Sequence, residues 1–314
     1  MFKHDYVKVF APATIANVGC GFDVLGMALY QPGDEIVLRR INEPEIKITE
    51  ISGDGGLLPT DADKNTATIS IKYLWNEIRP KGGLEVEVHK KMPMGSGLGS
   101  SAASSVGGVA ALNAMLETPL PNEKLLSYAL EGERVACGTP HADNAAACLY
   151  GGFVLVRSSE PVDIVPIQSP ENLYTAVLHP DIEILTENTR RILRKNIPLS
   201  LAVKQWANVG GLIAGLMKDD YELISRSLPD LVIEPIRSVL IPGFDAVKSS
   251  AMEKGALGCS ISGSGPSIFA LCHGEATAEE CGKEMKKTLD KMELESELYI
   301  SAVNPEGPKI LEYK

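Results

Sequence analysis

The chain has 314 residues, a length that at about 150 residues per domain allows two domains and a core large enough to need no disulfide or metal. It carries 30 Lys and Arg against 41 Asp and Glu, and this formal net charge of -11 argues against broad nucleic-acid binding and against adhesion to anionic membranes. With 44% hydrophobic and 23% charged residues and no apolar signal region at the N-terminus, the sequence indicates a folded cytoplasmic protein.

The first half of the chain predicts strands and helices in alternation. Strands are expected at residues 7–11, 35–40 and 45–51, and residues 65–77 have the apolar spacing of a helix. Leu84, Val86 and Val88 then alternate with polar neighbours, as in a half-buried strand. Further along, helices are expected at 102–116, 122–133 and 141–148, and a strand at 153–156.

A segment at residues 158–172 is rich in Pro and Ser and lacks periodicity, so it is expected to connect two domains. We place the boundary there, which gives domains at residues 1–165 and 166–314. In the second domain, strands are expected at 174–178, 259–261, 267–271 and 297–303, and helices at 188–195, 201–217, 244–254 and 277–291. Strands and helices segregated in this way predict an α+β fold.

The six cysteines lie mostly in small or apolar surroundings. They show no C-x-x-C spacing, which zinc sites and redox motifs often have. Free cysteine is among the residue types most often buried. We therefore expect reduced thiols in the core rather than disulfides or metal ligands.

The strongest local signal is the loop P-M-G-S-G-L-G-S-S-A-A at residues 93–103, between a strand and a helix of small residues. Three glycines at alternate positions remove the Cβ atoms that would keep a phosphate from the backbone, and the following helix directs free N–H groups to the same place. Ser100 and Ser101 can cap this helix or turn their hydroxyls toward a phosphate or Mg²⁺. The loop is neither a Walker loop nor G-x-G-x-x-G, and a turn that only lets the helix pack closely is the alternative.

Two further segments place polar residues among small or apolar ones. Residues 11–26 contain Asn17 and Asp23, which in turns often cap their own backbone. Residues 131–147 contain Glu133, His141, Asp143 and Asn144 beside many alanines. Glu133 alone would be a solvated helix residue and His141 alone a capping group, but four polar groups together favour a binding site.

In their order and spacing, three blocks resemble the GHMP small-molecule kinases: A-P-A-T-I-A-N-V-G-C-G-F-D at 11–23, the loop at 93–103, and S-I-S-G-S-G-P-S at 260–267. Within that superfamily, G-T-P-H-A-D-N, T-E-N-T-R-R-I-L and E-P-I-R-S-V-L-I-P-G-F resemble the homoserine kinase branch. The resemblance covers nearly the whole chain. It implies a two-domain α+β fold, with a ribosomal protein S5 domain 2-like N-terminal domain that contains a left-handed βαβ crossover, and a ferredoxin-like C-terminal domain.

The resemblance implies ATP-dependent phosphorylation of L-homoserine to O-phospho-L-homoserine, on the route to threonine, with Mg²⁺ as cofactor. It assigns Asn65 to the adenosine, Ser100 and Glu133 to Mg²⁺, and Thr186 to the neighbourhood of the γ-phosphate. One carboxylate and one hydroxyl suit Mg²⁺, which keeps several waters. The ATP phosphates are assigned to the whole loop: Pro93, Met94, Gly95, Ser96, Gly97, Leu98, Gly99, Ser100, Ser101, Ala102 and Ala103.

For the amino acid, the resemblance assigns Asn17 and Asp23 to the ammonium end, and Arg190 rather than Arg191, with Arg237, to the carboxylate. Paired guanidinium groups would give directional, charge-assisted hydrogen bonds to that carboxylate. His141, Asp143 and Asn144 would line the side-chain hydroxyl. Since Asn cannot accept a proton, we expect direct transfer from ATP with Asn144 orienting the hydroxyl; Asp143 as a base is the alternative.

Two other functions remain open from the sequence. Another GHMP kinase would act on mevalonate, phosphomevalonate, shikimate or a sugar, although Asp23 with two arginines favours an amino acid. A non-catalytic relative would keep the fold as a ligand sensor, although it would have no reason to retain a Mg²⁺ pair beside ATP. The resemblance also implies a homodimer.

Overall fold

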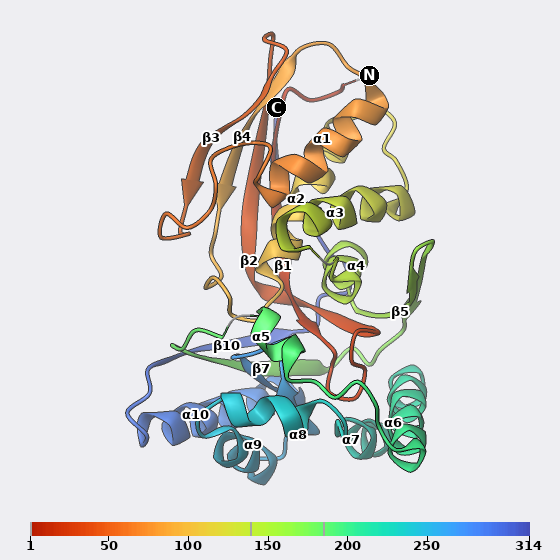
Figure 1. Ribbon diagram of the computed structural model, residues 1–314, viewed down its shortest axis with the longest axis vertical. Coiled ribbons are helices and arrows are strands. Elements are labelled where there is room, and N and C mark those ends of the chain that lie inside the picture. Colours follow the sequence, from red (N-terminus) through yellow and green to blue (C-terminus); the bar gives the residue numbers. More distant parts are fainter. Residues whose placement is uncertain (1, 139, 185) are drawn as a thin grey trace.

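Two β-sheets organise the computed structural model, and helices pack against each of them (Figure 1). The structure describes residues 2–138, 140–184 and 186–314, without the side chains of residues 136, 137, 186 and 187. The first sheet has seven strands and the second has four. This mixture of helices and sheets confirms the expected α+β class.

The first sheet gathers strands from both ends of the chain. Its main path has the order β11-β1-β2-β4-β3, and β5 pairs with β2 and β6. β3 and β4 are parallel, and α1 lies between them in the chain, so they form the expected βαβ crossover, whose left-handedness stays a prediction. The strands are β1 (Tyr6–Ala16), β2 (Leu25–Ile41), β3 (Ile46–Ser52), β4 (Gly83–His89), β5 (Phe153–Ser159), β6 (Val162–Ile167) and β11 (Lys309–Tyr313).

Four helices pack on one face of this sheet: α1 (Thr66–Ile78), α2 (Ser100–Met115), α3 (Asn122–Cys137) and α4 (Ala142–Tyr150). α2 lies innermost because small residues let its neighbours approach closely. A Cβ on Gly107 would lie 2.7 Å from Ile36 of the sheet, and one on Gly108 would lie 2.8 Å from the carbonyl oxygen of Ala67 in α1. The sheet and α1 therefore hold α2, and with it the loop that precedes α2.

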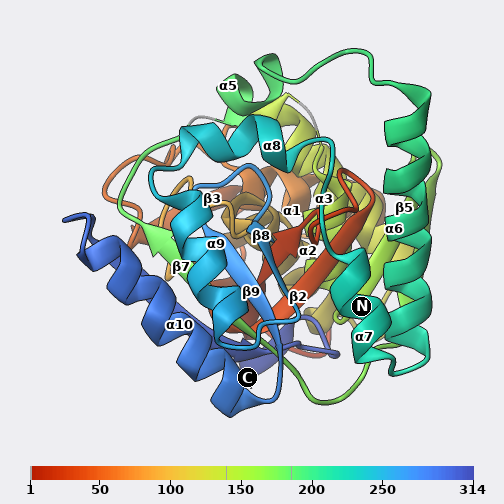
Figure 2. The ribbon, with the colours of Figure 1, turned by 90° about the horizontal axis from the view of Figure 1, so that it is seen from below.

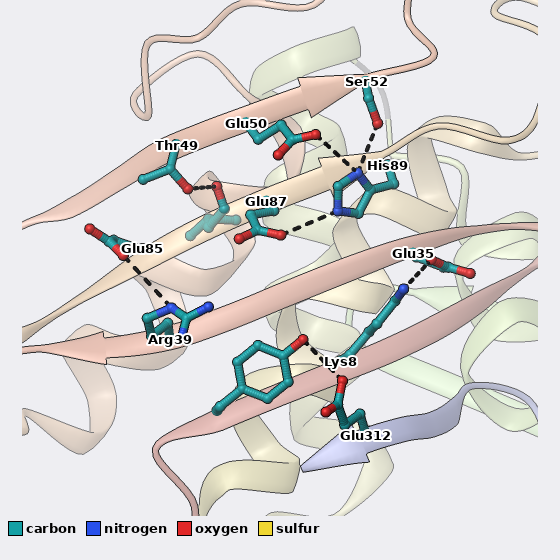
Figure 3. Close-up of polar contacts among 12 residues, drawn as sticks. Lys8, Glu35, Arg39, Thr49, Glu50, Ser52, Glu85, Glu87, His89 and Glu312 are labelled. Carbon is teal, nitrogen blue, oxygen red and sulfur yellow. Dashed lines mark hydrogen bonds and ion pairs between the residues drawn. The ribbon is translucent and has the colours of Figure 1, made fainter. Parts of the chain in front are cut away.

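The other face of the first sheet carries cross-strand polar pairs (Figure 3). Lys8 lies 2.7 Å from Glu35, and the Ser52 hydroxyl lies 2.8 Å from His89 Nδ1. The alternate residues of β4, Leu84, Val86 and Val88, are fully buried on the helix side. The half-buried strand that the sequence predicts is thereby confirmed.

The second sheet has the order β10-β7-β9-β8 and is antiparallel throughout. Helices connect β7 to β8 and β9 to β10, and β8 and β9 are adjacent antiparallel strands. This connection pattern and strand order are those of the expected ferredoxin-like arrangement. Figure 2 shows α9 and α10, which pack against each other, over this sheet. The elements are β7 (Leu173–Pro180), β8 (Gly258–Ile261), β9 (Ile268–His273), β10 (Ser296–Ala302), α9 (Phe244–Glu253) and α10 (Glu275–Asp290).

The segment between β7 and α9 supplies helices beside the junction of the two sheets (Figure 1). α5 (Thr186–Arg191) and α8 (Glu234–Arg237) are short and end in arginines. α6 (Leu199–Met217) and α7 (Tyr221–Ser227) pack against each other, and a 3₁₀ turn, η1 (Ser238–Leu240), follows α8.

Some sequence expectations are wrong in detail. The segment 158–172 is not simply a connection, because it contains β6, which forms a hairpin with β5. The expected helix at 188–195 ends at Arg191, whereas α3 continues past residue 133 to Cys137. β11, α7 and α8 were not expected. The division into residues 1–165 and 166–314 stays a prediction, although β6 and β11 place residues 166–167 and 309–313 in the first sheet.

Over the part of the chain that the structure describes, no helix is long and apolar enough to cross a membrane. Five cysteines are buried free thiols, as expected: Cys20, Cys148, Cys259, Cys272 and Cys281. The side chain of Cys137 lies outside the described residues.

Candidate active site

A cavity of about 420 Å³ lies where the loop before α2 meets residues from the second half of the chain. Most of the residues that the sequence singled out line it: Asn17, Asp23, Asn65, Met94, Gly95, Ser96, Gly97, Gly99, Ser100, Ser101, Ala102, Glu133, His141, Asp143, Asn144, Arg190 and Arg237. Pro93, Leu98 and Ala103 are not part of its lining. The side chain of Thr186 lies outside the described residues.

The glycine loop is held between β1 and a turn of the second half. Gly95, Gly97 and Gly99 have φ values of 68°, 79° and 70°, a region that side chains with a Cβ rarely adopt. A Cβ on Gly97 would lie 2.5 Å from the carbonyl oxygen of Ser262, and one on Gly99 would lie 2.0 Å from Thr14 Oγ1. The backbone conformation therefore favours glycine at all three positions, and close neighbours also require it at Gly97 and Gly99.

Groups that suit a phosphate border the cavity at this loop. α2 begins at Ser100 with Gly99 as its N-cap, so its free N–H groups and positive dipole end lie at the cavity. Ser96 is 1% exposed and lines the cavity, and its hydroxyl has no hydrogen-bond partner among the described residues. A buried hydroxyl without a partner fits a site completed by a bound ligand.

A buried ion pair anchors both ends of the loop. Lys90 Nζ contacts Asp34 and also donates to the Ser100 carbonyl oxygen and to Ser104 Oγ, each at 2.8 Å. The other Asp34 oxygen, Oδ1, accepts from the backbone N–H groups of Lys91 at 2.8 Å and Met92 at 3.2 Å. The two charged side chains are 1% and 0% exposed. The pair thus joins the chain just before the loop to the first turn of α2.

Glu133 contacts Ser101 in this structure, and the pair of Ser100 with Glu133 that the resemblance implies for Mg²⁺ stays a prediction. Ser101 Oγ donates to Glu133 Oε1 at 2.5 Å, whereas Ser100 Oγ donates to Asp34 at 3.2 Å. Consecutive residues of a helix point about 100° apart, so only one of the two hydroxyls faces Glu133. A carboxylate and a hydroxyl are hard oxygen donors that suit Mg²⁺.

His141 contacts the same carboxylate. Its Nδ1 lies 3.4 Å from Glu133 Oε2, and this hydrogen bond raises the pKa of His141. The imidazole and the Ser101 hydroxyl therefore contact different oxygens of the Glu133 carboxylate.

Asn144 has its carbonyl oxygen already engaged. Thr14 Oγ1 donates to Asn144 Oδ1 at 2.7 Å, which leaves the amide NH₂ as the end of this side chain that can serve a ligand in the cavity. Asp143 Oδ1 accepts from the backbone N–H of Asn144 at 2.9 Å. Burial, with the charge of Asp23, raises the pKa of Asp143 to about 6.

Opposite charges face each other at the far part of the cavity. Arg190 donates to both carboxylate oxygens of Asp23, at 2.9 and 3.2 Å. Arg237 is buried and donates to the Gly263 carbonyl oxygen at 3.0 Å; burial, with the charge of Arg190, lowers its pKa. The Phe22 ring lies 5.1 Å from the guanidinium carbon of Arg237 and 5.9 Å from that of Arg190. This arrangement can receive a small ligand that carries both charges.

Asn17 shapes the backbone of the same region. Its side-chain oxygen accepts from the Asp23 N–H at 3.0 Å, and its amide donates to the Gly263 carbonyl oxygen at 2.8 Å. Asn17 and Asp23 have φ values of 70° and 59°, which are uncommon outside glycine. Asn17 therefore positions Asp23.

Asn65 is the N-cap of α1. Its side-chain oxygen accepts from the Ala67 N–H at 3.1 Å, and its amide donates to the Pro59 carbonyl oxygen at 3.1 Å. Asn65 lies in the cavity wall with both ends of its amide engaged.

Sequence reasoning missed several residues that build the site. Asp34 follows Pro32-Gly33 and Lys90 precedes Lys91, and neither residue belongs to one of the motif blocks. Thr14 and Phe22 lie inside the first motif block, in which only Asn17 and Asp23 were expected to contribute to the site. One signal could have found Lys90: it continues the two-residue period of Leu84, Val86 and Val88 and so belongs to the buried face.

Comparison with known proteins agrees with the geometry. The model of the GHMP kinases N terminal domain matches residues 65–152, and that of the GHMP kinases C terminal region matches residues 212–291. A homoserine kinase of Chlorobium phaeobacteroides is 48% identical, with the alignment covering 97% of this chain and 99% of the relative. That of Chloroherpeton thalassium is 49% identical with the same coverage, 97% and 99%.

Solved structures point to the same family. The crystal structure of homoserine kinase from Cytophaga hutchinsonii superposes with a TM-score of 0.96 at 55% identity, over 99% of both chains. L. major mevalonate kinase in complex with R-mevalonate has a TM-score of 0.72 at 17% identity, over 96% of this chain and 99% of that one, and therefore shares the fold alone. The chain thus belongs to the homoserine kinases of the GHMP kinase family.

Proposed function

We propose that this protein transfers the γ-phosphoryl group of ATP to the side-chain hydroxyl of L-homoserine and releases ADP and O-phospho-L-homoserine. The observation that carries the proposal is the pairing of Asp23 with Arg190 beside Arg237, in the cavity that also contains the glycine loop. A free amino acid has one ammonium and one carboxylate group, so it can exchange partners with this ion pair. The ammonium would then meet Asp23, and the carboxylate would meet Arg190 and Arg237.

The chain's own groups suit the phosphates and the metal. We assign the ATP phosphates to the loop at 93–103, to the N-terminus of α2 and to Ser96, and Mg²⁺ to Ser101 and Glu133. When bound, Mg²⁺ supplies positive charge that neutralises the charge developing on the phosphates. We assign Asn65 to the wall of the adenosine pocket and Thr186 to the neighbourhood of the γ-phosphate.

Asn144 orients the accepting hydroxyl in this proposal. Its NH₂ group would donate to the hydroxyl oxygen, because its carbonyl oxygen accepts from Thr14. The hydroxyl oxygen forms a bond to the γ-phosphorus as the bond to the ADP oxygen breaks, and the proton leaves late, to a phosphate oxygen or to solvent. His141 and Asp143 complete the wall around this hydroxyl.

We also propose a homodimer in the cytoplasm, as the family resemblance implies. Several apolar side chains of α6 are largely exposed, among them Leu199, Val203, Trp206 and Met217, and a second copy would cover such a surface. Light scattering after size exclusion should give twice the mass of one chain. A single-chain mass at micromolar concentration would contradict the dimer.

The function is tested by ADP release with Mg-ATP across L-homoserine, L-serine, L-threonine, shikimate, mevalonate and galactose. We expect the highest kcat/KM with L-homoserine. Arg237→Ala should raise the KM for L-homoserine roughly 10- to 100-fold, since a charge-assisted hydrogen bond contributes about 1.5–3 kcal/mol, and should leave the KM for ATP nearly unchanged. Highest activity on another acceptor would contradict the substrate, and no turnover with any acceptor would favour the ligand-sensor alternative.

The metal assignment predicts different effects for two neighbouring serines. Ser101→Ala should raise the Mg²⁺ concentration needed for half-maximal activity by ~10-fold, because it removes an oxygen beside Glu133. Ser100→Ala is the matched control: it removes a hydrogen bond to Asp34 and should lower stability by about 1 kcal/mol without changing the Mg²⁺ requirement. The opposite result in Mg²⁺ titrations would favour Ser100 as the ligand, as the resemblance implies.

The pH dependence distinguishes orientation by Asn144 from base catalysis by Asp143. With its pKa raised to about 6, Asp143 is ionised above that pH and protonated below it. If Asp143 accepted the hydroxyl proton, kcat would fall as the pH dropped through 6, and Asp143→Asn would abolish this limb with a loss of about 10²–10⁴ in kcat. We expect Asp143→Asn to keep the shape of the kcat–pH profile and to lose less than ~10-fold in kcat.

A further inference from the structure

We propose that Gln205 and Asp230, which lie outside the cavity lining, are positioning residues that set the affinity for the amino acid but not for ATP. The inference rests on the proposed function, in which Asp23 and Arg237 bind the amino acid. The residues come from α6 and from the segment before α8, and both are buried, with 9% and 7% of their surface exposed.

Asp230 organises the segment that carries Arg237. Its Oδ1 accepts from the backbone N–H groups of Val232 at 2.9 Å and Ile233 at 3.0 Å, and its Oδ2 accepts from that of Glu234 at 2.8 Å. Glu234 is the first residue of α8, and Arg237 is the last. The carboxylate of Asp230 therefore fixes where this four-residue helix begins, and thereby where Arg237 lies.

Gln205 joins that segment to the loop that carries Asp23. Its Nε2 donates to Asp230 Oδ1 at 2.9 Å and to the Cys20 carbonyl oxygen at 2.7 Å, and its Oε1 accepts from the Leu231 N–H at 3.0 Å. Both amide hydrogens and the amide oxygen are thus used. One side chain therefore connects the segment before Arg237 with the loop just before Asp23.

The loop at residues 17–24, which contains Cys20 and Asp23, is tightly packed, so the bond from Gln205 to Cys20 also restricts the position of Asp23. A Cβ on Gly19 would lie 2.2 Å from the carbonyl oxygen of Leu228, so the loop is pressed against the end of α7. Asn17 and Arg237 then share one acceptor, the Gly263 carbonyl oxygen, at 2.8 and 3.0 Å. The loop and the segment of α8 are therefore connected twice, through the Gly263 carbonyl oxygen and through Gln205. These two connections set the distance between Asp23 and Arg237.

The glycine loop shares the turn at residues 262–267 with the amino-acid groups, but its own bonds do not depend on Gln205 or Asp230. Its anchors are the Lys90–Asp34 pair and the hydrogen bonds from Ser262 Oγ to the Gly97 carbonyl oxygen and from the Ser267 N–H to the Ser96 carbonyl oxygen. None of these bonds involves Gln205 or Asp230. A disturbance of Gln205 should therefore move the groups for the amino acid and leave those for the phosphates in place.

The principal test is the isosteric change Gln205→Glu, which replaces both N–H donors with an acceptor that faces the Cys20 carbonyl oxygen and the Asp230 carboxylate. We expect the KM for L-homoserine to rise on the order of 10-fold or more, and the KM for ATP to change less than ~2-fold. Gln205→Asn keeps the amide but shortens the side chain by one methylene, and it should show the same selective rise. Both variants are measured as the full chain, with thermal unfolding recorded in parallel.

Asn304→Asp is the matched control. Asn304 is a buried amide that organises the turn at 304–307 through bonds to Gly307 and Glu306, and it lies outside the cavity lining. This variant should lower the unfolding temperature but leave the KM for L-homoserine unchanged. A rise in that KM would show that replacing a buried amide by a carboxylate weakens L-homoserine binding wherever it is made, which would contradict the proposal.

Arg237→Ala, measured in the same assays, distinguishes a failure of the positioning role from a failure of the proposed function. If Arg237→Ala raises the KM for L-homoserine but neither Gln205 variant does, the positioning role is wrong and the proposed function stands. If none of the three changes raises it, the assignment of the amino-acid site is wrong. Variants of Gln205 that lose affinity for ATP and L-homoserine together, or that do not fold, show a general structural role and overturn the proposal.

Discussion

The buried ion pair between Lys90 and Asp34 is the constraint on which the active-site loop depends. Both charges are removed from water, and each is compensated by the other and by hydrogen bonds to the backbone or to Ser104. Removing one partner of such a pair costs about 3–5 kcal/mol, because the remaining charge stays buried without compensation. Since the bonds hold the chain on both sides of the glycine loop, the shape of the proposed phosphate site depends on this buried pair of charges.

The second half of the chain closes the loop from the other side. Gly97 approaches the turn that begins at Ser262 so closely that a Cβ would not fit, and the same turn presents Gly263 to Asn17 and Arg237. One turn thus contacts the proposed phosphate loop and the proposed amino-acid site. In the proposed reaction this turn would help to set the distance between the phosphate and the amino acid, and proximity of this kind is a large part of the rate enhancement of phosphoryl transfer.

Local periodicity predicted the elements whose buried residues recur at the spacing of a strand or a helix. It did not find strands whose pairing depends on residues far away in the chain. β4 was predictable from the alternation of Leu84, Val86 and Val88, and α1 from its apolar spacing. β6 was missed because Pro166 interrupts its pattern, which a strand paired on one side through β5 tolerates. β11 was missed because its partner, β1, lies at the other end of the chain. For the site, the sequence predicted most of the cavity lining, but the contact of Ser101 with Glu133 depends on the phase of the helix, which the sequence does not show at neighbouring serines.

The positions of the carboxylates favour a transfer without a dedicated base. Asp23 is paired with Arg190, and Glu133 contacts Ser101 and His141. Asp34 is buried and forms an ion pair with Lys90. Asp143 remains, but one of its oxygens accepts from the backbone of Asn144, and burial raises its pKa to about 6. Asn144 itself presents a donor, because Thr14 occupies its oxygen. In the proposed reaction the acidic groups would therefore act mainly through their charge, and a hydroxyl oriented by Asn144 would keep its proton until the new bond to phosphorus has largely formed.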